Sequence, residues 1–153
     1  MHTKKITLAV IDDHNLLRTQ FCDLLDKLGY EVIIQAENGK DALKKFESIK
    51  QLPKVCLLDV SMPVMDGFET AAALSKKYPG LRILACSLNN DEDSVIGMIR
   101  SGARGYMVKT GTVPETKQAI DTISDSGYYF DRHAAKILLE YLRKDVSPQK
   151  SHR

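Results

Sequence analysis

The stretch CLLDVSMPVMDG, residues 56–67, joins a buried apolar run to a turn. Its first residues belong to KVCLLD, which predicts a strand over residues 54–59 that ends on Asp59. A buried strand that ends on a carboxylate needs an explanation. Helix capping does not supply one, because Asp66 lies next to Gly67, directly before the helical run FETAAALSKKY, and is the better N-cap. The rest of the chain has to explain Asp59.

Apolar runs alternate along the chain with segments of helical period. The runs predict strands over residues 5–11, 31–36, 54–59, 81–87 and 103–109. The segments between and after them predict helices over residues 15–28, 39–50, 67–78, 91–102 and 113–127. Five βα units in a row predict an α/β fold, with a parallel sheet covered by helices on both faces. We expect the flavodoxin-like (βα)5 three-layer sandwich with strand order 2-1-3-4-5.

Polar residues stand at the carboxyl ends of these strands, where such sheets place their functional sites. They are the acidic pair Asp12-Asp13, Asp59, Ser87 and Lys109, with Tyr106 inside the fifth strand. In the expected order, strands one and three are neighbours, so their three carboxylates converge on one pocket. Two carboxylates ~4 Å apart repel by on the order of 4 kcal/mol at an effective dielectric near 20. Lys109 and a hard divalent cation with oxygen ligands, Mg²⁺, would compensate that repulsion.

This arrangement suggests a reaction. Asp12 and Asp13 would hold Mg²⁺, while Asp59 keeps an oxygen free to attack a phosphoryl group and form an acyl phosphate. Each residue alone has an ordinary alternative: the acidic pair could open a helix, Ser87 could cap a turn, and Lys109 could be solvated. Their convergence at one sheet edge favours the functional interpretation.

Three segments of the chain resemble the receiver domain of two-component response regulators. VIDDHNLLR is similar to the acidic-pair segment of that family, LLDVSMPVMDG to its phosphorylation-site segment, and SGARGYMVK to its fifth-strand segment. They occur in order and at suitable spacing, and the resemblance covers nearly all of residues 5–127.

The resemblance implies a role for each site residue. Asp59 would be the phosphoacceptor, and Asp12, Asp13 and Asp59 would bind Mg²⁺ together with the backbone carbonyl of Ser61. Ser87 would hydrogen-bond the phosphoryl group, Tyr106 would be an aromatic switch that turns inward with Ser87, and Lys109 would pair with phosphoryl oxygens. The phosphodonor would be a sensor histidine kinase or a phosphotransfer protein, with Mg²⁺-dependent self-phosphorylation from small donors and self-dephosphorylation.

Three positions depart from the commonest pattern of the family. Thr110 stands where many members have a cis proline, so we expect a trans Lys109–Thr110 bond. Leu88 replaces a small residue, and we hypothesise that it shields the acyl phosphate from water. Asn89 lies where members of the family tune the dephosphorylation rate, with an effect whose sign the sequence leaves open.

The C-terminal part of the chain resembles a linker helix. DDHNLLR and SGARGYMVK are closest to the LuxR/NarL-type (FixJ-like) subfamily, in which a receiver precedes a DNA-binding helix-turn-helix domain. We therefore expect a receiver domain at 1–127, a linker helix at 128–145 and a flexible tail at 146–153. The apolar face of that helix would carry Ala134, Ile137, Leu138, Tyr141 and Leu142. The helix-turn-helix domain is missing, so the sequence is either a truncated regulator or a stand-alone receiver.

Composition is that of a soluble protein with a single compact domain. The chain has 153 residues, 27% of them charged and 43% hydrophobic. Its three cysteines form no CxxC pair, which predicts reduced core thiols and a cytoplasmic location. We expect no signal peptide, no membrane segment and no direct DNA contact outside the missing domain, although residues 131–153 carry a net charge of +3.

Other functions remain as alternatives. A haloacid-dehalogenase-type phosphatase is disfavoured, because its D-x-D-x-[TV] pattern is replaced here by DVSMP. A flavodoxin is disfavoured because Asp12-Asp13 would repel a phosphate. A receiver that is never phosphorylated would act only as an interaction module.

For a phosphorylated receiver, we expect the response to reach the surface near helix four, strand five and helix five, with dimerisation or partner binding as the output.

Overall fold

Strands and helices alternate along the whole described part of the chain. The computed structural model describes residues 4–62, 64–109 and 111–145. The strands are β1 (Thr7–Ile11), β2 (Glu31–Ala36), β3 (Val55–Asp59), β4 (Arg82–Ser87), β5 (Gly105–Val108) and β6 (Tyr129–Phe130). The helices are α1 (Asn15–Lys27), α2 (Gly39–Glu47), α3 (Gly67–Lys77), α4 (Glu92–Arg100), α5 (Val113–Ser126) and α6 (Arg132–Asp145). The five predicted strands and the five predicted helices between and after them are confirmed, with shifts of a few residues at their ends.

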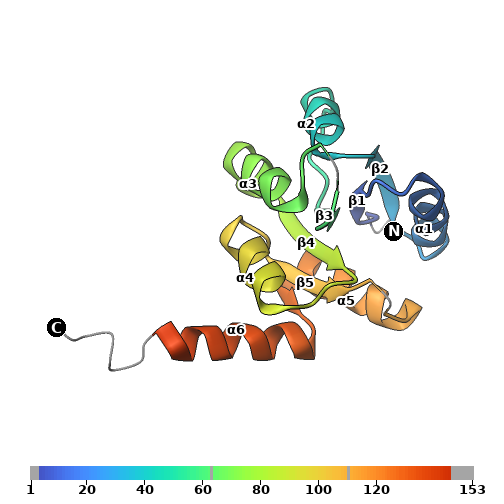
Figure 1. Cartoon of the computed structure of the whole chain (residues 1–153). Helices are drawn as coiled ribbons and strands as arrows, with labels where there is room; N and C mark the ends of the chain where they lie inside the picture. Colours follow the sequence, from blue (N-terminus) through green and yellow to red (C-terminus); the bar gives the residue numbers. More distant parts are fainter. Residues whose placement is uncertain (1–3, 63, 110, 146–153) are drawn as a thin grey trace.

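The strands form one parallel sheet in the order β2-β1-β3-β4-β5-β6 (Figure 1). The flavodoxin-like order of the first five strands is therefore confirmed. β1 lies directly beside β3, with Leu8 opposite Val55, and β3 lies beside β4, with Asp59 opposite Cys86. The carboxyl ends of β1 and β3 therefore meet at one edge of the sheet.

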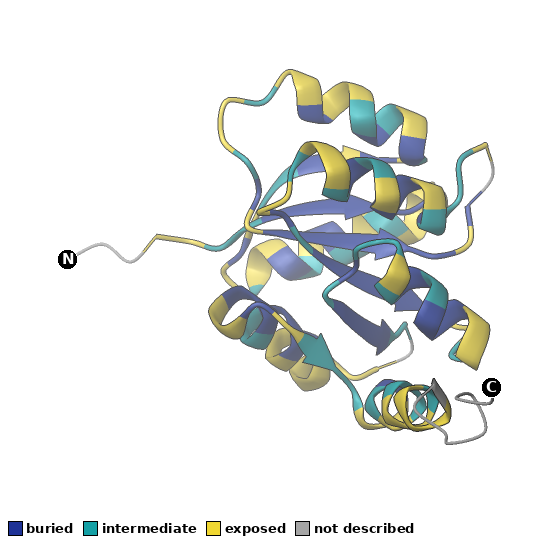
Figure 2. Cartoon of the chain, turned by 90° about the vertical axis from the view of Figure 1, so that its left-hand side faces the viewer, coloured by how far each residue is buried: buried dark blue, intermediate teal, exposed yellow. Residues whose placement is uncertain are grey.

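Alternate residues of each strand pack against different helical layers. In β1, Leu8 and Val10 join a core cluster with residues of α1 and α5, whereas Ala9 and Ile11 join a second cluster with residues of α2, α3 and α4. The central strands are buried on both faces, and the helices expose only their outer sides (Figure 2). This is the predicted three-layer sandwich, which gives the strand ends a rigid support.

The segment after β3 is shaped by Asp66 and Gly67. Asp66 is the N-cap of α3, where its Oδ1 accepts a hydrogen bond from the Glu69 N–H (2.9 Å) and Glu69 completes a capping box. A Cβ on Gly67 would lie 2.6 Å from the Cα of Val60, so only glycine lets α3 begin this close to the end of β3. Asp66 thus does the capping, as predicted, and Asp59 is left available at the sheet edge.

The C-terminal part differs from the single helix expected over residues 128–145. Gly127 ends α5 in the left-handed region (φ 95°), and Tyr129–Phe130 then pairs with β5 as the short strand β6. A Cβ on Gly105 would lie 2.5 Å from the Tyr129 carbonyl oxygen, so the glycine permits this pairing. The helix itself starts only at Arg132, and the tail expected at 146–153 lies outside the described residues.

α6 packs back onto the same core. Ala134 is buried, and Ile137, Leu138 and Tyr141 are half-buried, as the predicted apolar face requires. Leu142, which was also placed on that face, is 50% exposed. The separation of a receiver domain from a linker helix at residue 127 stays a prediction.

All three cysteines are buried and form no disulfide, which confirms the prediction of core thiols. Burial raises the pKa of Cys86 to about 12, so this thiol stays protonated and unreactive at neutral pH. Within the described ranges, no helix combines the length and the apolar character that a membrane crossing requires.

Val64 offers a test of backbone strain in the loop after β3. It is a β-branched residue with φ +68°, a left-handed conformation that favours glycine, and it is 76% exposed. We expect Val64→Gly to raise the free energy of unfolding by about 0.5–1 kcal/mol, because relief of strain exceeds the added entropy of the unfolded chain. Val113→Gly, at an exposed position with an ordinary φ, should instead destabilise the protein. Urea unfolding measures both, and a loss of stability in Val64→Gly would contradict the assignment of strain.

Candidate functional site

Three carboxylates meet where β1 and β3 end. Asp12, Asp13 and Asp59 each offer an oxygen atom, and these atoms all lie within 4.8 Å of one another. Asp12 and Asp59 are buried, whereas Asp13 is exposed. The convergence expected from the strand order is thus present in the structure.

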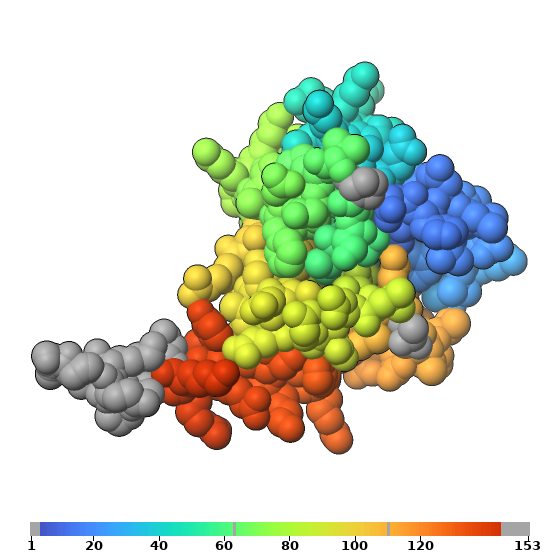
Figure 3. All heavy atoms as spheres, viewed as in Figure 1, coloured from blue at the N-terminus to red at the C-terminus, as the bar shows by residue number. Residues whose placement is uncertain are grey.

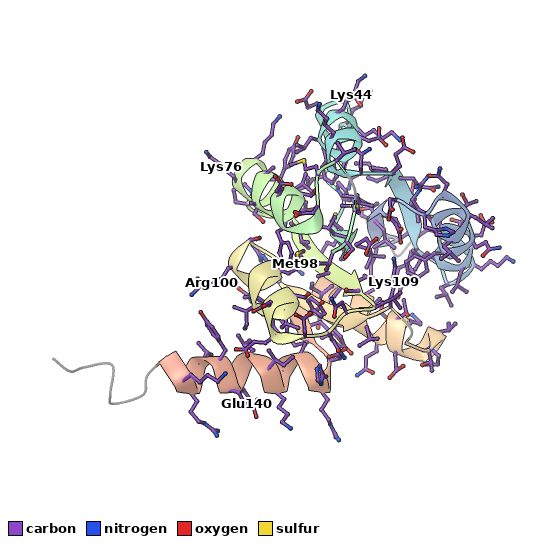
Figure 4. The ribbon with its side chains drawn as sticks, viewed as in Figure 1. Lys44, Lys76, Met98, Arg100, Lys109 and Glu140 are labelled. Atoms are coloured by element: carbon purple, nitrogen blue, oxygen red, sulfur yellow. The ribbon has the colours of Figure 1, made fainter. Side chains whose placement is uncertain are left out.

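Lys109 lies directly after β5 and reaches two of these carboxylates. Its Nζ is 2.8 Å from Asp12 Oδ2 and 3.4 Å from Asp59 Oδ2 (Figure 4 labels Lys109). Burial alone lowers the pKa of Lys109, but the two carboxylates outweigh burial, so the pKa lies above its ordinary value. Lys109 is therefore a cation at neutral pH and binds two of the three carboxylates.

Asp59 carries the most perturbed carboxyl group of the site. Burial raises its pKa from 3.8 to about 6; the positive charge of Lys109 opposes this rise, and the negative charge of Asp12 adds to it. At neutral pH the carboxyl is ionised, yet its environment disfavours the charge. A further cation would stabilise the ionised form of this carboxylate, and its perturbed pKa makes Asp59 a candidate nucleophile.

The loop from β1 to α1 fixes Asp12 in place. Asp12 Oδ1 accepts a hydrogen bond from the His14 N–H (2.9 Å), and Arg18 Nη1 donates to the Asp12 carbonyl oxygen (2.6 Å). His14 is the N-cap of α1, where its Nδ1 accepts from the Leu17 N–H, so the acidic pair does not open this helix. Arg18 was not among the predicted site residues, although a cation in the first turn of a helix is unfavourable for the helix dipole and was a usable signal.

Ser87 and Tyr106 stand on the other side of the site, at β4 and β5. Ser87 is buried, and its Oγ accepts a hydrogen bond from the Asn89 N–H (2.9 Å). Tyr106 is fully buried, and its hydroxyl donates to the Asn89 carbonyl oxygen. Both side chains therefore hold the loop that follows β4, and Tyr106 already points inward.

A cavity of about 600 Å³ opens at this edge of the sheet. The polar side of its lining includes Asp12, Asp13, Asp59, Ser61, Ser87 and Lys109, and the apolar side includes Leu17, Phe21, Leu57, Cys86 and Met107. Leu88 also lines it but is 71% exposed, and its effect on phosphoryl lifetime stays a prediction. The Ser61 carbonyl as a metal ligand is likewise untested, and the Lys109–Thr110 bond lies outside the described residues.

The donor set fits a hard divalent cation. Three carboxylates face one lysine, which leaves two negative charges uncompensated when all three are ionised. Mg²⁺ binds through one or two carboxylates and keeps several waters, a geometry that a partly exposed cluster can accept. The residues present are therefore suited to the cation that the sequence predicts.

The raised pKa of Asp59 gives a pH-dependent stability. The folded state binds the Asp59 proton more tightly than the unfolded chain does. The free energy of unfolding therefore falls as the pH rises from about 4 to about 6, and the whole loss is present above pH 6. Asp59→Asn should therefore be more stable than the native chain at pH 7.5 in EDTA, by up to about 3 kcal/mol. The gain should vanish toward pH 4 in thermal melts. Asp125→Asn, on the exposed side of α5, should show no such gain; a pH-independent effect of Asp59→Asn would contradict the assignment.

Comparisons with known proteins agree with this geometry. Residues 8–121 match the family model described as response regulator receiver domain. The chain is 31% identical over 116 residues to the chemotaxis protein CheY of Listeria monocytogenes, covering 76% of this chain and 96% of CheY. It is 29% identical over 148 residues to the transcriptional regulatory protein DegU of Brevibacillus brevis, covering 96% of this chain and 62% of DegU.

A solved structure supports the same assignment. The signal receiver domain of the response regulator NarL from Mycobacterium tuberculosis superposes with a TM-score of 0.74 at 30% identity, covering 81% of this chain and 99% of that domain. The family match and this neighbour agree with the fold described above. The chain belongs to the response regulator receiver domain family.

Proposed function

We propose that the chain is a phosphorylation-controlled switch that accepts a phosphoryl group on Asp59. The single observation that supports this most strongly is the gathering of Asp12, Asp13 and Asp59 at the sheet edge, where Lys109 binds two of them. Asp59 is buried, and burial raises its pKa to about 6, so its environment disfavours the ionised form. Formation of an acyl phosphate would remove that buried carboxylate charge from Asp59.

The chemistry follows from the positions of these side chains. A carboxylate oxygen of Asp59 attacks the phosphorus of the donor, and the bond from phosphorus to the donor atom breaks with its electron pair on the donor. With acetyl phosphate, the products are an aspartyl phosphate and acetate. Lys109, bound to Asp12 and Asp59, stabilises the charge on the transferred group. Bound Mg²⁺ would add Lewis-acid stabilisation of that charge.

The relatives suggest partners on either side of this step. Receiver domains interact with histidine kinases or phosphotransfer proteins, and we propose that this chain receives its phosphoryl group from one of them. It spans 62% of the length of the transcriptional regulatory protein DegU, so control of transcription through further sequence is a proposal for this chain. Residence in the cytoplasm and dimerisation on phosphorylation are proposals of the same kind.

Intact mass spectrometry tests the proposal directly. After incubation with acetyl phosphate and Mg²⁺, we expect a mass increase of one phosphoryl group. Asp59→Asn should abolish the addition, because the nucleophile is lost, whereas Asp66→Asn, in the same loop but engaged as a helix cap, should keep it. EDTA should prevent the addition in the native chain.

A missing mass increase, with acetyl phosphate and with a kinase alike, would contradict the proposal. It would favour the unphosphorylated interaction module instead. An addition that survives Asp59→Asn would place the acceptor elsewhere.

The loop after β4 would carry the effect of Asp59 phosphorylation to α6. The Ser87 hydroxyl accepts from the Asn89 N–H, and the Tyr106 hydroxyl donates to the carbonyl of the same residue. One residue further, the Asn90 carbonyl accepts from His133 Nε2 (3.0 Å), which belongs to the first turn of α6. A phosphoryl group that draws Ser87 toward it would release Asn89, so the loop and its contact with α6 would change.

α6 lies over the region where the response is expected. It runs alongside α4, and the two surfaces are in contact (Figure 3). Arg100 of α4 donates a hydrogen bond to the Tyr141 hydroxyl and stacks over its ring. Lys144 Nζ lies 3.5 Å from Glu92 Oε1. Asp131 accepts from the Val108 N–H (3.2 Å), directly before Lys109. Asp131, directly before α6, and His133, in its first turn, thus tie the start of α6 to β5 and to the loop after β4.

Hydrogen exchange measures this coupling. We expect phosphorylation to speed amide exchange in residues 132–145 by about fivefold, the effect of losing one hydrogen bond of about 1 kcal/mol. His133→Ala should speed the exchange without phosphorylation, and Asp59→Asn should remove the response to acetyl phosphate. Lys136→Ala, on the exposed face of α6, is the matched control. Equal exchange in both phosphorylation states would show that α6 is not coupled to the site.

A further inference from the structure

Arg18 occupies an unusual position beside the acidic cluster. It is the fourth residue of α1, close to the positive end of the helix dipole, where a cation is disfavoured. It is half-buried, and its guanidinium makes two directed hydrogen bonds. Nη1 donates to the Asp12 carbonyl oxygen (2.6 Å), and Nε donates to Gln35 Oε1 (3.4 Å) at the end of β2.

The Asp12 carbonyl belongs to the peptide group that joins Asp12 to Asp13. Asp12 itself is held at several further points: its N–H donates to the Ala36 carbonyl (3.0 Å), and its carboxylate binds the His14 N–H and Lys109. Asp13 is different. Within residues 4–62, 64–109 and 111–145, no hydrogen bond or ion pair holds its exposed carboxylate. Its place in the cluster therefore depends on the orientation of the peptide before it.

We propose that Arg18 is a positioning residue for the cation site. Its fork-shaped guanidinium ties the Asp12–Asp13 peptide to Gln35 on β2, so that the Asp13 carboxylate stays within reach of Asp12 and Asp59. The inference rests on the proposed function, in which these carboxylates bind Mg²⁺. Arg18 contacts the backbone and not the metal or the phosphoryl group, so its role is indirect.

The two possible effects of Arg18, positioning of Asp13 and electrostatic repulsion, predict opposite changes in Mg²⁺ affinity when Arg18 is removed. Arg18 is a cation near a cation site, so on electrostatic grounds alone its removal should tighten Mg²⁺ binding. If it positions Asp13, its removal should weaken Mg²⁺ binding, as the loss of outer-shell partners does in metal sites, by about tenfold. The sign of the change therefore separates the two roles.

The experiment is an NMR titration of the full chain with Mg²⁺ at pH 7.5. We expect Arg18→Ala to bind Mg²⁺ about tenfold more weakly than the native chain. Arg18→Lys should bind Mg²⁺ no more tightly than Arg18→Ala, since it keeps the repelling charge but lacks the fork. Gln35→Ala should weaken binding in the same direction by a smaller factor. Lys45→Ala removes a charge from the same sheet edge, where Lys45 binds the Gln35 carbonyl and Asp41, and it should not weaken binding.

The outcomes are distinguishable. A native chain that binds no Mg²⁺ would overturn the proposed cation site and the inference with it. A native chain that binds, with Arg18→Ala binding equally or more tightly, would overturn only the role of Arg18. Thermal melts in EDTA accompany each variant; lower stability with unchanged Mg²⁺ affinity would make Arg18 a structural residue and contradict the inference.

Discussion

The mutual repulsion of three carboxylates at one sheet edge is the constraint on which the rest of the structure depends. Asp12, Asp13 and Asp59 offer oxygens within 4.8 Å of one another, and Lys109 is the cation that joins two of them. Such a cluster persists only on a support that does not relax. The doubly covered sheet provides it, because β1 and β3 are packed on both faces by separate core clusters.

The same constraint explains the loops around the site. The capping box at Asp66 and the close approach of Gly67 to Val60 fix the segment after β3. The segment after β1 is fixed by His14 and Arg18, and the segment after β4 by Ser87 and Tyr106. Two of these loops thus orient acidic groups, and the third connects the site to α4 and α6. We propose that a charge added at Asp59 acts on that third loop, which Tyr106 and His133 hold by long-range hydrogen bonds.

The fold and the main site residues could be predicted because their signals are regular. Apolar runs and helical periods located five strands and five helices, and the strand order then placed Asp59 beside the acidic pair. β6 was not predictable in this way, since two residues are too few to show a period, and its pairing depends on the missing side chain of Gly105. The predicted helix therefore began too early, at residue 128 and not at Arg132, and Leu142, expected on its apolar face, is 50% exposed. The position of Arg18 in the first turn of α1 was a signal, but its partner is a backbone carbonyl, which a pattern of residue types does not show.

The most direct test of the account is the chemical identification of the acceptor residue. Borohydride reduces an aspartyl phosphate to homoserine, so the phosphorylated chain can be reduced, digested and mapped by mass spectrometry. We expect homoserine at position 59 and unmodified aspartate at positions 12 and 13. Homoserine at position 12 or 13, or none in a chain that has gained phosphoryl mass, would contradict the assignment of Asp59 as the nucleophile.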